Sequence, residues 1–452
     1  MTSFLSMPHG VAVPAASAAW AVLACMIAAS VAAEPAPSAP AALAAHVEKL
    51  AAGERPLGAD LAGLLDAARA QSPELAAAQD DARAMQERVG AAGALPDPVL
   101  RVELENVTNA GNGRSPSLLP WQTGDTKITL MQALPLWGKR DLRRDQAHAE
   151  AEEASARAAL AWNGLAARIK LAFAQYLEAS GNARILDETA QLLQAMTRLA
   201  DARYAAGPGA QQDAIQARIE EAALRAERIA LDGARRQAAA RINALLGRAA
   251  DAPLAEPQPP RPLPAAAQLS AQALLERALS TNPELAAEQA RLQAARSGQA
   301  LAERNRYPDL QVGISPTQTG WRLTNWSLMV EMSIPLQRDA RRAEENEAVA
   351  RVAAQRARAQ ALQARLHGEL VENLAALDAA QRSQALLAAE LLPQSELGWR
   401  SALAAYENGK VDFATLLEAQ RRIRQGRVSH LQAQVQARLR LAEIERLVGE
   451  AL

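Results

Sequence analysis

Four short stretches of the chain alternate apolar and polar residues, which is the pattern of a β-strand with two different faces. They are Val99–Val107, Thr126–Leu134, Asp309–Ile314 and Ser327–Ile334. In the first of them, which begins V-L-R-V-E-L-E, apolar side chains occupy every second position between charged ones. The sequence therefore predicts two strands in each half of the chain.

Much longer stretches favour helices, because they are rich in alanine, leucine, glutamate, glutamine and arginine. From Lys139 no proline occurs before Pro208, so one helix of roughly 100 Å is expected there. A return helix is expected over Gln211–Leu246. A second long helix begins after Pro335, and Pro393 is expected to cause a kink or a restart in it. Helices of this length exceed the size of an ordinary globular domain.

The same order of elements occurs twice, with a separation of about 200 residues, which indicates duplication of a domain-sized unit. Ser72-Pro73-Glu74-Leu75 recurs as Asn282-Pro283-Glu284-Leu285, and Leu245-Leu246-Gly247 recurs as Leu447-Val448-Gly449. The expected fold is mainly α with a small β part. We expect a signal peptide at 1–33, a flexible segment at 34–56, repeats at 57–250 and 267–452, and a proline-rich linker at 251–266.

The N-terminal segment is typical of an exported protein. Val11–Ala33 is apolar and rich in small residues, and Val31-Ala32-Ala33 before Glu34 suits cleavage by signal peptidase. The preceding Met1–Gly10 departs from this pattern because it lacks lysine and arginine. Cys25 is the only cysteine, and it is either acylated, as in a lipoprotein, or removed with the signal peptide. A permanent membrane anchor is a further alternative.

Composition excludes several classes of function. The net charge of -1 gives no basic face for nucleic acid. The five histidines are scattered, and the chain lacks the motifs of zinc peptidases, serine hydrolases and phosphate-binding loops. Carboxylates on long helices are usually solvated or ion-paired. We therefore expect neither an enzyme, nor a cofactor, nor a metal site.

Four strands are too few to close a membrane barrel, since the smallest such barrels have about eight. Three copies of the chain would supply twelve strands around one pore. Five of the few aromatic residues cluster near strand ends, as in an interfacial girdle, and are Trp121, Trp137, Tyr307, Trp321 and Trp326. A soluble β-hairpin with charges facing solvent is the alternative, but it does not require this concentration of tryptophan.

Several motifs in this order resemble the TolC family of outer-membrane efflux factors. They are the two Pro-Glu-Leu caps, Ala94-Leu95-Pro96-Asp97-Pro98, the junction Leu134-Pro135-Leu136-x-Gly138-Lys139-Arg140, and two Tyr-x-x-Gly turns, Tyr204 to Gly207 and Tyr406 to Gly409. The resemblance implies a homotrimer with a twelve-stranded barrel in the outer membrane and a long α-helical tunnel in the periplasm. It also implies a periplasmic adaptor protein and an inner-membrane resistance-nodulation-division transporter as partners.

The resemblance places a gate at the periplasmic tip of the tunnel. Asp213 and Tyr406 fall where family members link neighbouring hairpins and hold the tip closed. Glu418 falls where a ring of carboxylates lines the constriction, whereas Thr415 stands where the family has the other carboxylate. Repeated carboxylates around a narrow bore would favour cations. The alternative interpretation is that Asp213 only caps its helix and Glu418 is a solvated surface residue.

The turns at the same tip are the expected docking site for the adaptor. They contain Tyr204, Gly207, Gly409 and Lys410, and Lys410 stands beside Val411, where the family has a basic gate partner. The two glycines are expected to permit positive φ at the ends of helices.

Apolar residues on the helices near these turns allow two interpretations. Leu416, Leu417, Ala419, Ile215 and Ala217 either form a seam against other hairpins or an adaptor, or belong to the intramolecular core.

Two of these motifs also bear on the cargo. The Leu-Pro-Asp-Pro and Gly-Lys-Arg motifs are similar to those of the heavy-metal, CzcC-like branch, which implies divalent cations, copper or silver. Drugs or other small organic molecules are an alternative. A soluble periplasmic adaptor or coiled-coil scaffold is an alternative of another class.

Overall fold

The computed structural model describes residues 57–111, 113, 115–205, 210–258, 262–264 and 269–452. The expected signal peptide, the lipidation candidate Cys25 and the turn residue Gly207 lie outside these ranges. The described chain divides into two compact units. The sheet unit consists of Ala91–Arg144 and Gly298–Glu347, and the helical unit contains the remaining described residues.

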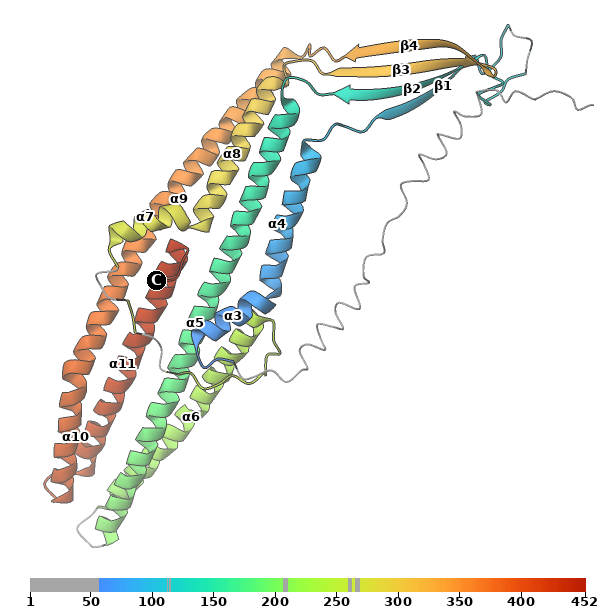
Figure 1. Cartoon of the computed structure of the whole chain (residues 1–452). Coiled ribbons are helices and arrows are strands. Elements are labelled where there is room, and N and C mark those ends of the chain that lie inside the picture. Colours follow the sequence, from blue (N-terminus) through green and yellow to red (C-terminus); the bar gives the residue numbers. More distant parts are fainter. Residues whose placement is uncertain (1–56, 112, 114, 206–209, 259–261, 265–268) are drawn as a thin grey trace, which may run out of the picture. The chain divides into compact units, whose positions relative to one another are not determined.

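The elements follow one another in an order that is nearly the same in the two halves of the chain (Figure 1). The first half contains α3 (Leu61–Gln71), α4 (Pro73–Ala92), β1 (Val99–Glu105), β2 (Asp125–Leu134), α5 (Lys139–Ala205) and α6 (Gln211–Leu246). The second half contains α7 (Ala271–Thr281), α8 (Pro283–Arg304), β3 (Leu310–Thr319), β4 (Arg322–Met332), α9 (Arg338–Leu386), the π-helical turn η2 (Leu387–Leu391), α10 (Leu392–Glu407) and α11 (Phe413–Val448).

The mainly helical fold with a small strand part is confirmed, and so is the long first helix. Helix α5 contains 67 residues without a break, which corresponds to about 100 Å. Asp60 accepts a hydrogen bond from the backbone N–H of Gly63 and thereby begins α3.

The second hairpin differs from the expectation from sequence. A loop was expected between Ile314 and Ser327, but β3 and β4 are longer and are joined by a tight turn at Gly320. Gly320 has φ +63°, a conformation that glycine adopts without a steric penalty. Pro316 lies within the longer β3 and pairs with Trp326 in the ladder. Proline lacks only the N–H donor, so the strand passes through it where that donor is not required.

The four strands form one antiparallel sheet in the order β1-β2-β3-β4, and one face of this sheet is apolar. The register aligns Leu100, Leu130, Ile314 and Leu328 in a row across all four strands. All four side chains are exposed, and the neighbouring rows on this face contribute the exposed Val102, Val330 and Trp326. The apolar face is therefore uncovered within the chain.

The opposite face of the sheet is mostly polar. One row of it aligns Arg101, Thr129, Ser315 and Ser327. Thr129 and Ser315 are buried, and their hydroxyl oxygens lie 2.7 Å apart. A sheet of a soluble domain normally covers its apolar face and exposes its polar one. This sheet shows the reverse arrangement.

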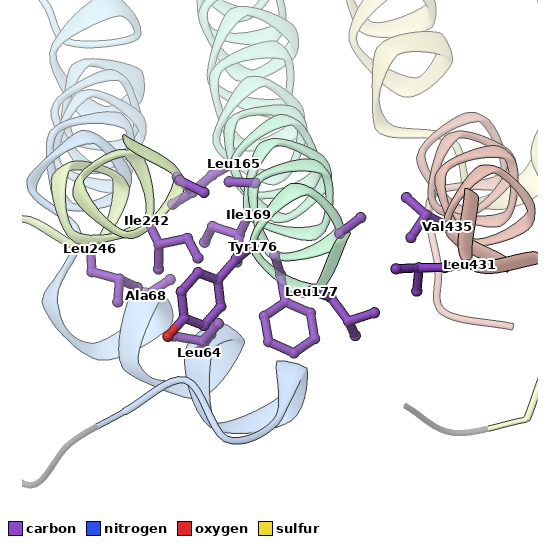
Figure 2. Close-up of a cluster of buried hydrophobic side chains, with 14 of the residues drawn as sticks. Leu64, Ala68, Leu165, Ile169, Tyr176, Leu177, Ile242, Leu246, Leu431 and Val435 are labelled. Atoms are coloured by element: carbon purple, nitrogen blue, oxygen red, sulfur yellow. The ribbon is translucent and has the colours of Figure 1, made fainter. Parts of the chain in front are cut away.

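The helical unit has a core in which helices distant in sequence meet. Figure 2 shows Leu64 and Ala68 of α3 beside Leu165 and Ile169 of α5. Residues Ile242 and Leu246 of α6 belong to the same cluster, as do Leu431 and Val435 of α11. The phenol of Tyr176 donates a hydrogen bond to the carbonyl of Ala255, 3.2 Å away. This cluster fixes α3 against the long helices.

Equivalent glycines end α6 and α11. Gly247 has φ +71° and Gly449 has φ +93°, so both adopt the left-handed cap conformation. A Cβ atom on Gly247 would lie 3.0 Å from Cδ of Pro73, and one on Gly449 would lie 3.1 Å from Cδ of Pro283. In both halves, therefore, the end of the last helix packs on the proline that begins the second helix.

The expected interruption at Pro393 is present, although it takes a different form from a simple kink. A π-helical turn at Leu387–Leu391 precedes the proline, and α10 begins at Leu392. A proline inside a helix loses one hydrogen bond and clashes with the preceding turn, and the wider π turn accommodates both effects. Gly426 of α11 faces this turn, since a Cβ atom there would lie 2.8 Å from Cδ2 of Leu391.

Candidate functional site

Two helical hairpins of the helical unit meet at Tyr406. One hairpin is α5–α6 and the other is α10–α11. The Tyr406 side chain is 2% exposed, and its hydroxyl donates a hydrogen bond to Oδ2 of Asp213 over 3.3 Å. Its ring contacts Phe413 edge-on, with centroids 5.7 Å apart. Tyr406 and Asp213, which sequence analysis paired only by resemblance, are in contact in this structure.

Arg203 completes this cluster, and sequence reasoning missed it. Its guanidinium lies over the Tyr406 ring, 4.7 Å from the centroid, and it also donates a hydrogen bond to the backbone carbonyl of Tyr406. A Cβ atom on Gly409 would lie 3.2 Å from Nη2 of Arg203, and Gly409 has φ +71°. Glycine is thus required there for its conformation and favoured by the approach of the arginine. The available signal was a basic residue in the last turn of α5.

The protonation of Tyr406 follows from its surroundings. Burial, the nearby charge of Asp213 and the hydrogen bond to it raise the pKa of Tyr406 to about 12, while Arg203 opposes the shift. The phenol therefore keeps its proton throughout the neutral range and acts as the donor to the Asp213 carboxylate. The cluster combines a neutral donor, an anion and a cation.

Asp213 is not the N-cap of its helix. Helix α6 begins after Ala210, which provides no side-chain cap. Asp213 lies in the first turn, where a carboxylate interacts favourably with the helix dipole. Its position therefore allows it to stabilise the helix and to bind Tyr406 at once.

The two tyrosines that precede the turns differ in exposure, although the sequences are similar. Tyr204 is half exposed, whereas Tyr406 is buried. In the second turn, the backbone N–H of Lys410 donates to the carbonyl of Ala405 over 2.9 Å. The Lys410 side chain is exposed. Among the expected docking residues, Tyr204, Gly409 and Lys410 are thus accessible in the described turns.

Thr415 belongs to a cap at the start of α11. Oδ1 of Asp412 accepts hydrogen bonds from the backbone N–H of Thr415 over 2.9 Å and from its hydroxyl over 2.6 Å. The hydroxyl and backbone hydrogen bonds from Thr415 lower the pKa of Asp412. Where the resemblance implies a carboxylate at position 415, this chain has a threonine bound to the carboxylate of Asp412.

Glu418 is exposed and forms an ion pair with Arg422 one turn further along α11, at 3.1 Å. Both residues border a groove of about 630 Å³ between α10 and α11, which is also lined by small residues such as Gly398 and Ala402. Glu418 is therefore not an isolated carboxylate in the single chain.

A row of arginines joins α11 to the other hairpin. Arg421 binds Glu220 of α6 at 2.6 Å, Arg424 binds Glu227 of α6, and Arg427 binds Glu188 of α5 at 2.8 Å. Arg424 and Arg427 also line a cavity of about 350 Å³ with Trp399. This row was not predicted, although arginines at a spacing of three residues in the sequence were a visible signal.

The apolar residues near the turns divide between the two interpretations. Leu416, Leu417 and Ala217 are buried in one cluster with Tyr406 and therefore belong to the intramolecular core. Ile215, by contrast, is exposed and belongs to none of the buried clusters of the described residues.

Aromatic side chains lie at both ends of the sheet. At the end with the β1–β2 loop, Trp121 stacks on Trp321 with centroids 5.5 Å apart. At the helix-side end, Trp137 packs on Tyr307 at 5.2 Å, and its indole N–H donates to the carbonyl of Pro308 over 2.8 Å. Trp326 is exposed on the apolar face.

A buried lysine fixes the helix-side end. The Lys139 side chain is 3% exposed. Its Nζ donates to the carbonyl of Tyr307 over 2.8 Å and to Oδ1 of Asp309 over 2.9 Å. Trp137 and Gly138 before it both have positive φ, which is uncommon for a residue as large as tryptophan. The motif Gly-Lys-Arg thus joins β2 and α5 to the start of β3.

The described residues contain neither a cluster of potential metal ligands nor a helix that could span a membrane. No three side chains of His, Cys, Asp or Glu lie together in a way that could hold a metal ion. Within the same residues, every helix is too short or too polar to cross a lipid bilayer.

The chain is similar to known proteins in sequence and in fold. A model of the family described as outer membrane efflux protein matches residues 64–248 and 274–450. The cobalt-zinc-cadmium resistance protein CzcC of Cupriavidus metallidurans is 26% identical over 326 residues, which cover 70% of this chain and 75% of that protein.

Solved structures share the fold. The outer-membrane channel OprN has a TM-score of 0.72 at 20% identity, over 86% of this chain and 90% of that one. The outer membrane protein VceC of Vibrio cholerae has a TM-score of 0.73 at 18% identity, over 86% of this chain and 96% of that one.

Proposed function

The chain belongs to the family of outer membrane efflux proteins, which are passive channels and not enzymes. We propose that this chain is the exit duct of a tripartite pump for heavy-metal cations. In this proposal, three copies form a twelve-stranded barrel in the outer membrane and a helical tunnel below it. An inner-membrane transporter of the resistance-nodulation-division class and a periplasmic adaptor deliver the cargo.

The observation that carries the proposal is the reversed sheet. Its exposed row of Leu100, Leu130, Ile314 and Leu328 suits lipid, and its row of Arg101, Thr129, Ser315 and Ser327 suits a water-filled pore. In water, the apolar face would be unfavourable by about 25 cal/mol for each Å². In a bilayer, the same face is in its preferred environment.

Assembly from several copies is supported by surfaces that lack a partner in one chain. Among the described residues, strands β1 and β4 each pair with one neighbour, so each has a free edge. Helix α6 exposes Ile215, Ile219 and Ile229. The segment from the end of α9 through η2 into α10 exposes Leu386, Leu391 and Leu397. In a ring, the two helical stripes would pack on neighbouring copies.

The gate is proposed at the cluster of Tyr406, Asp213 and Arg203, because it holds the ends of the two hairpins together. The adaptor would dock at the exposed turn residues Tyr204, Gly409 and Lys410. Asp412 and Glu418 would supply carboxylates near the tip, and carboxylates repeated around an axis favour cations. The heavy-metal cargo is supported by the relative named for cobalt, zinc and cadmium resistance.

Two experiments test this proposal. The full chain is expressed in a Gram-negative host, the membranes are fractionated, and the mass of the detergent-extracted species is measured. A trimer from the outer membrane with conductance in planar bilayers is expected, and a soluble monomer would contradict the channel. Deletion of the gene from its host should lower tolerance of cobalt, zinc or cadmium. Lower tolerance of drugs alone would contradict the cargo.

A further inference from the structure

An exposed apolar row on β4 continues beyond the strand and ends at an arginine. The row contains every second residue and consists of Leu328, Val330, Met332, Ile334 and Leu336, each at least half exposed. Arg338 follows two residues later as the first residue of α9, and it is also exposed. A long cationic side chain at the end of an apolar surface can extend its charge towards a polar layer.

Arg338 is one of four exposed arginines at this end of the sheet unit that have no carboxylate at ion-pair distance among the described residues, and we call these four the arginine belt. The others are Arg143 in α5, Arg304 at the end of α8, and Arg342 in α9. Their neighbours Arg144 and Arg341, by contrast, form ion pairs. The four guanidinium groups are therefore accessible to an external anion, although α9 also carries carboxylates.

The opposite end of the sheet has fewer cationic side chains. The sequence from Asn106 to Gly124, which joins β1 to β2, contains one ionisable residue, Arg114. The β3–β4 turn is formed by Gly320 and Trp321, and the exposed Arg322 follows it as the first residue of β4. The larger group of exposed arginines thus lies at the helix-side end of the apolar face.

The aromatic pair Trp137 and Tyr307 lies between the apolar face and the belt. The two rings pack at 5.2 Å and are partly exposed. Aromatic side chains of this kind prefer the boundary between acyl chains and headgroups. Along the chain, the order is therefore an apolar face, then an aromatic pair, then unpaired arginines.

We propose that the arginine belt binds the anionic headgroups of phospholipids in the leaflet that faces the periplasm. This inference rests on the proposed membrane insertion of the sheet, and it adds a lipid partner. A guanidinium matches a phosphate oxygen pair in geometry and charge. Basic residues close to a membrane surface attract anionic lipids. Phosphatidylglycerol and cardiolipin carry the net negative charge that zwitterionic lipids lack.

The experiment uses the full-length protein purified in detergent and incubated with mixed micelles of phosphatidylcholine and phosphatidylglycerol. The lipids retained after gel filtration are counted by mass spectrometry. We expect phosphatidylglycerol to be enriched over the input ratio by at least about fivefold, which corresponds to the contribution of one arginine near a membrane surface. The variant R143Q/R304Q/R338Q/R342Q should return to the input ratio.

A matched control removes the same number of charges elsewhere. Arg184, Arg198, Arg356 and Arg358 are exposed residues of the helical unit and have no carboxylate partner among the described residues. The control variant R184Q/R198Q/R356Q/R358Q should keep the enrichment. Excess inorganic phosphate should not displace the lipid, because the headgroup is held together with its acyl chains.

Three outcomes would overturn the proposal: no enrichment in the native protein, equal loss in both variants, or displacement by free phosphate. Conductance of the same preparation separates this inference from the proposed function. A conducting trimer without enrichment removes only the lipid site, whereas a preparation that neither inserts nor conducts removes the channel as well. Trimer mass and conductance of the belt variant show whether it has folded.

Discussion

The hydroxyl of Tyr406 lies 3.3 Å from Oδ2 of Asp213, and the two residues are 193 positions apart in the chain. This one hydrogen bond therefore joins the two helical hairpins. The guanidinium of Arg203 lies over the Tyr406 ring in the same cluster. If the hairpins separate when the channel opens, this contact must break first.

Tyr406→Phe should therefore favour the open tip. The substitution removes the donor but keeps the ring and its contacts, so the loss is that of one hydrogen bond to a charged group, about 1.5 to 3 kcal/mol. We expect a higher leak conductance of the trimer in planar bilayers. Tyr204→Phe is the control, because Tyr204 is half exposed. Equal effects of the two substitutions would contradict the gate.

High pH should open the tip of the native protein and not that of Tyr406→Phe. The pKa of Tyr406 is raised from 10.0 to about 12, mainly by burial. If the closed state binds the phenol proton of Tyr406 more tightly than the open state does, this proton stabilises the closed state. That stabilisation is complete below pH 10 and is lost as the pH rises towards 12. Leak conductance measured against pH checks this, and a rise of the same size in the variant would assign it to other groups.

Arg203→Ala should open the tip as well, and Arg203→Lys should restore only part of the contact. Lysine keeps the charge but lacks the planar fork that stacks on the ring while it donates to the carbonyl. The increases in leak conductance caused by Tyr406→Phe and by Arg203→Ala should be less than additive in the double variant, since both substitutions act on one cluster. Strict additivity of the two changes in conductance would show that the residues act independently.

Gly449→Ala should lower the thermal stability of the helical unit. A Cβ atom there would lie 2.7 Å from the carbonyl oxygen of Thr281, and φ is +93°. We expect a destabilisation of about 1 to 3 kcal/mol. Gly233→Ala in α6 is the matched control, because nothing lies within 4 Å of its Cβ position. That substitution should stabilise the helix by about 0.5 to 1 kcal/mol, and melting followed by circular dichroism distinguishes the two.

Loss of the Asp309 carboxylate and loss of the Lys139 ammonium should have unequal effects on assembly. Lys139 is 3% exposed and Asp309 is 38% exposed. Asp309→Ala leaves a buried ammonium without its carboxylate, whereas Lys139→Met leaves a carboxylate that water can reach. Asp309→Ala should therefore reduce the yield of assembled trimer more than Lys139→Met. Comparison of trimer yields from washed membranes tests this order, and the reverse order would mean that the lysine is solvated.

Local sequence rules were sufficient for the elements themselves. The run of helix formers after Lys139 and the cap at Pro283 determine α5 and α8 through local preferences, and both were predicted. The end of β3 was placed too early, at Ile314, whereas the strand continues to Thr319 and Pro316 is accommodated opposite Trp326. That position depends on the register with β4, which is not a local property.

Most of the contacts between the hairpins could not be predicted from the sequence. Tyr406 and Asp213 were paired through resemblance, and no local pattern leads to Arg203 or to the contact of Arg427 with Glu188. Each of these contacts joins helices that are distant along the chain, so it depends on how the hairpins pack. The alternation in β1 and β4, by contrast, predicted the two faces of the sheet correctly.

The free edges of β1 and β4 have a consequence for biogenesis. In the proposed channel, each protomer would present two rows of unpaired backbone donors and acceptors next to the exposed apolar face before the copies assemble. Such edges can pair with other exposed strands and lead to aggregation. On the proposed function, the yield of assembled channel should therefore depend on how well these edges are protected before insertion.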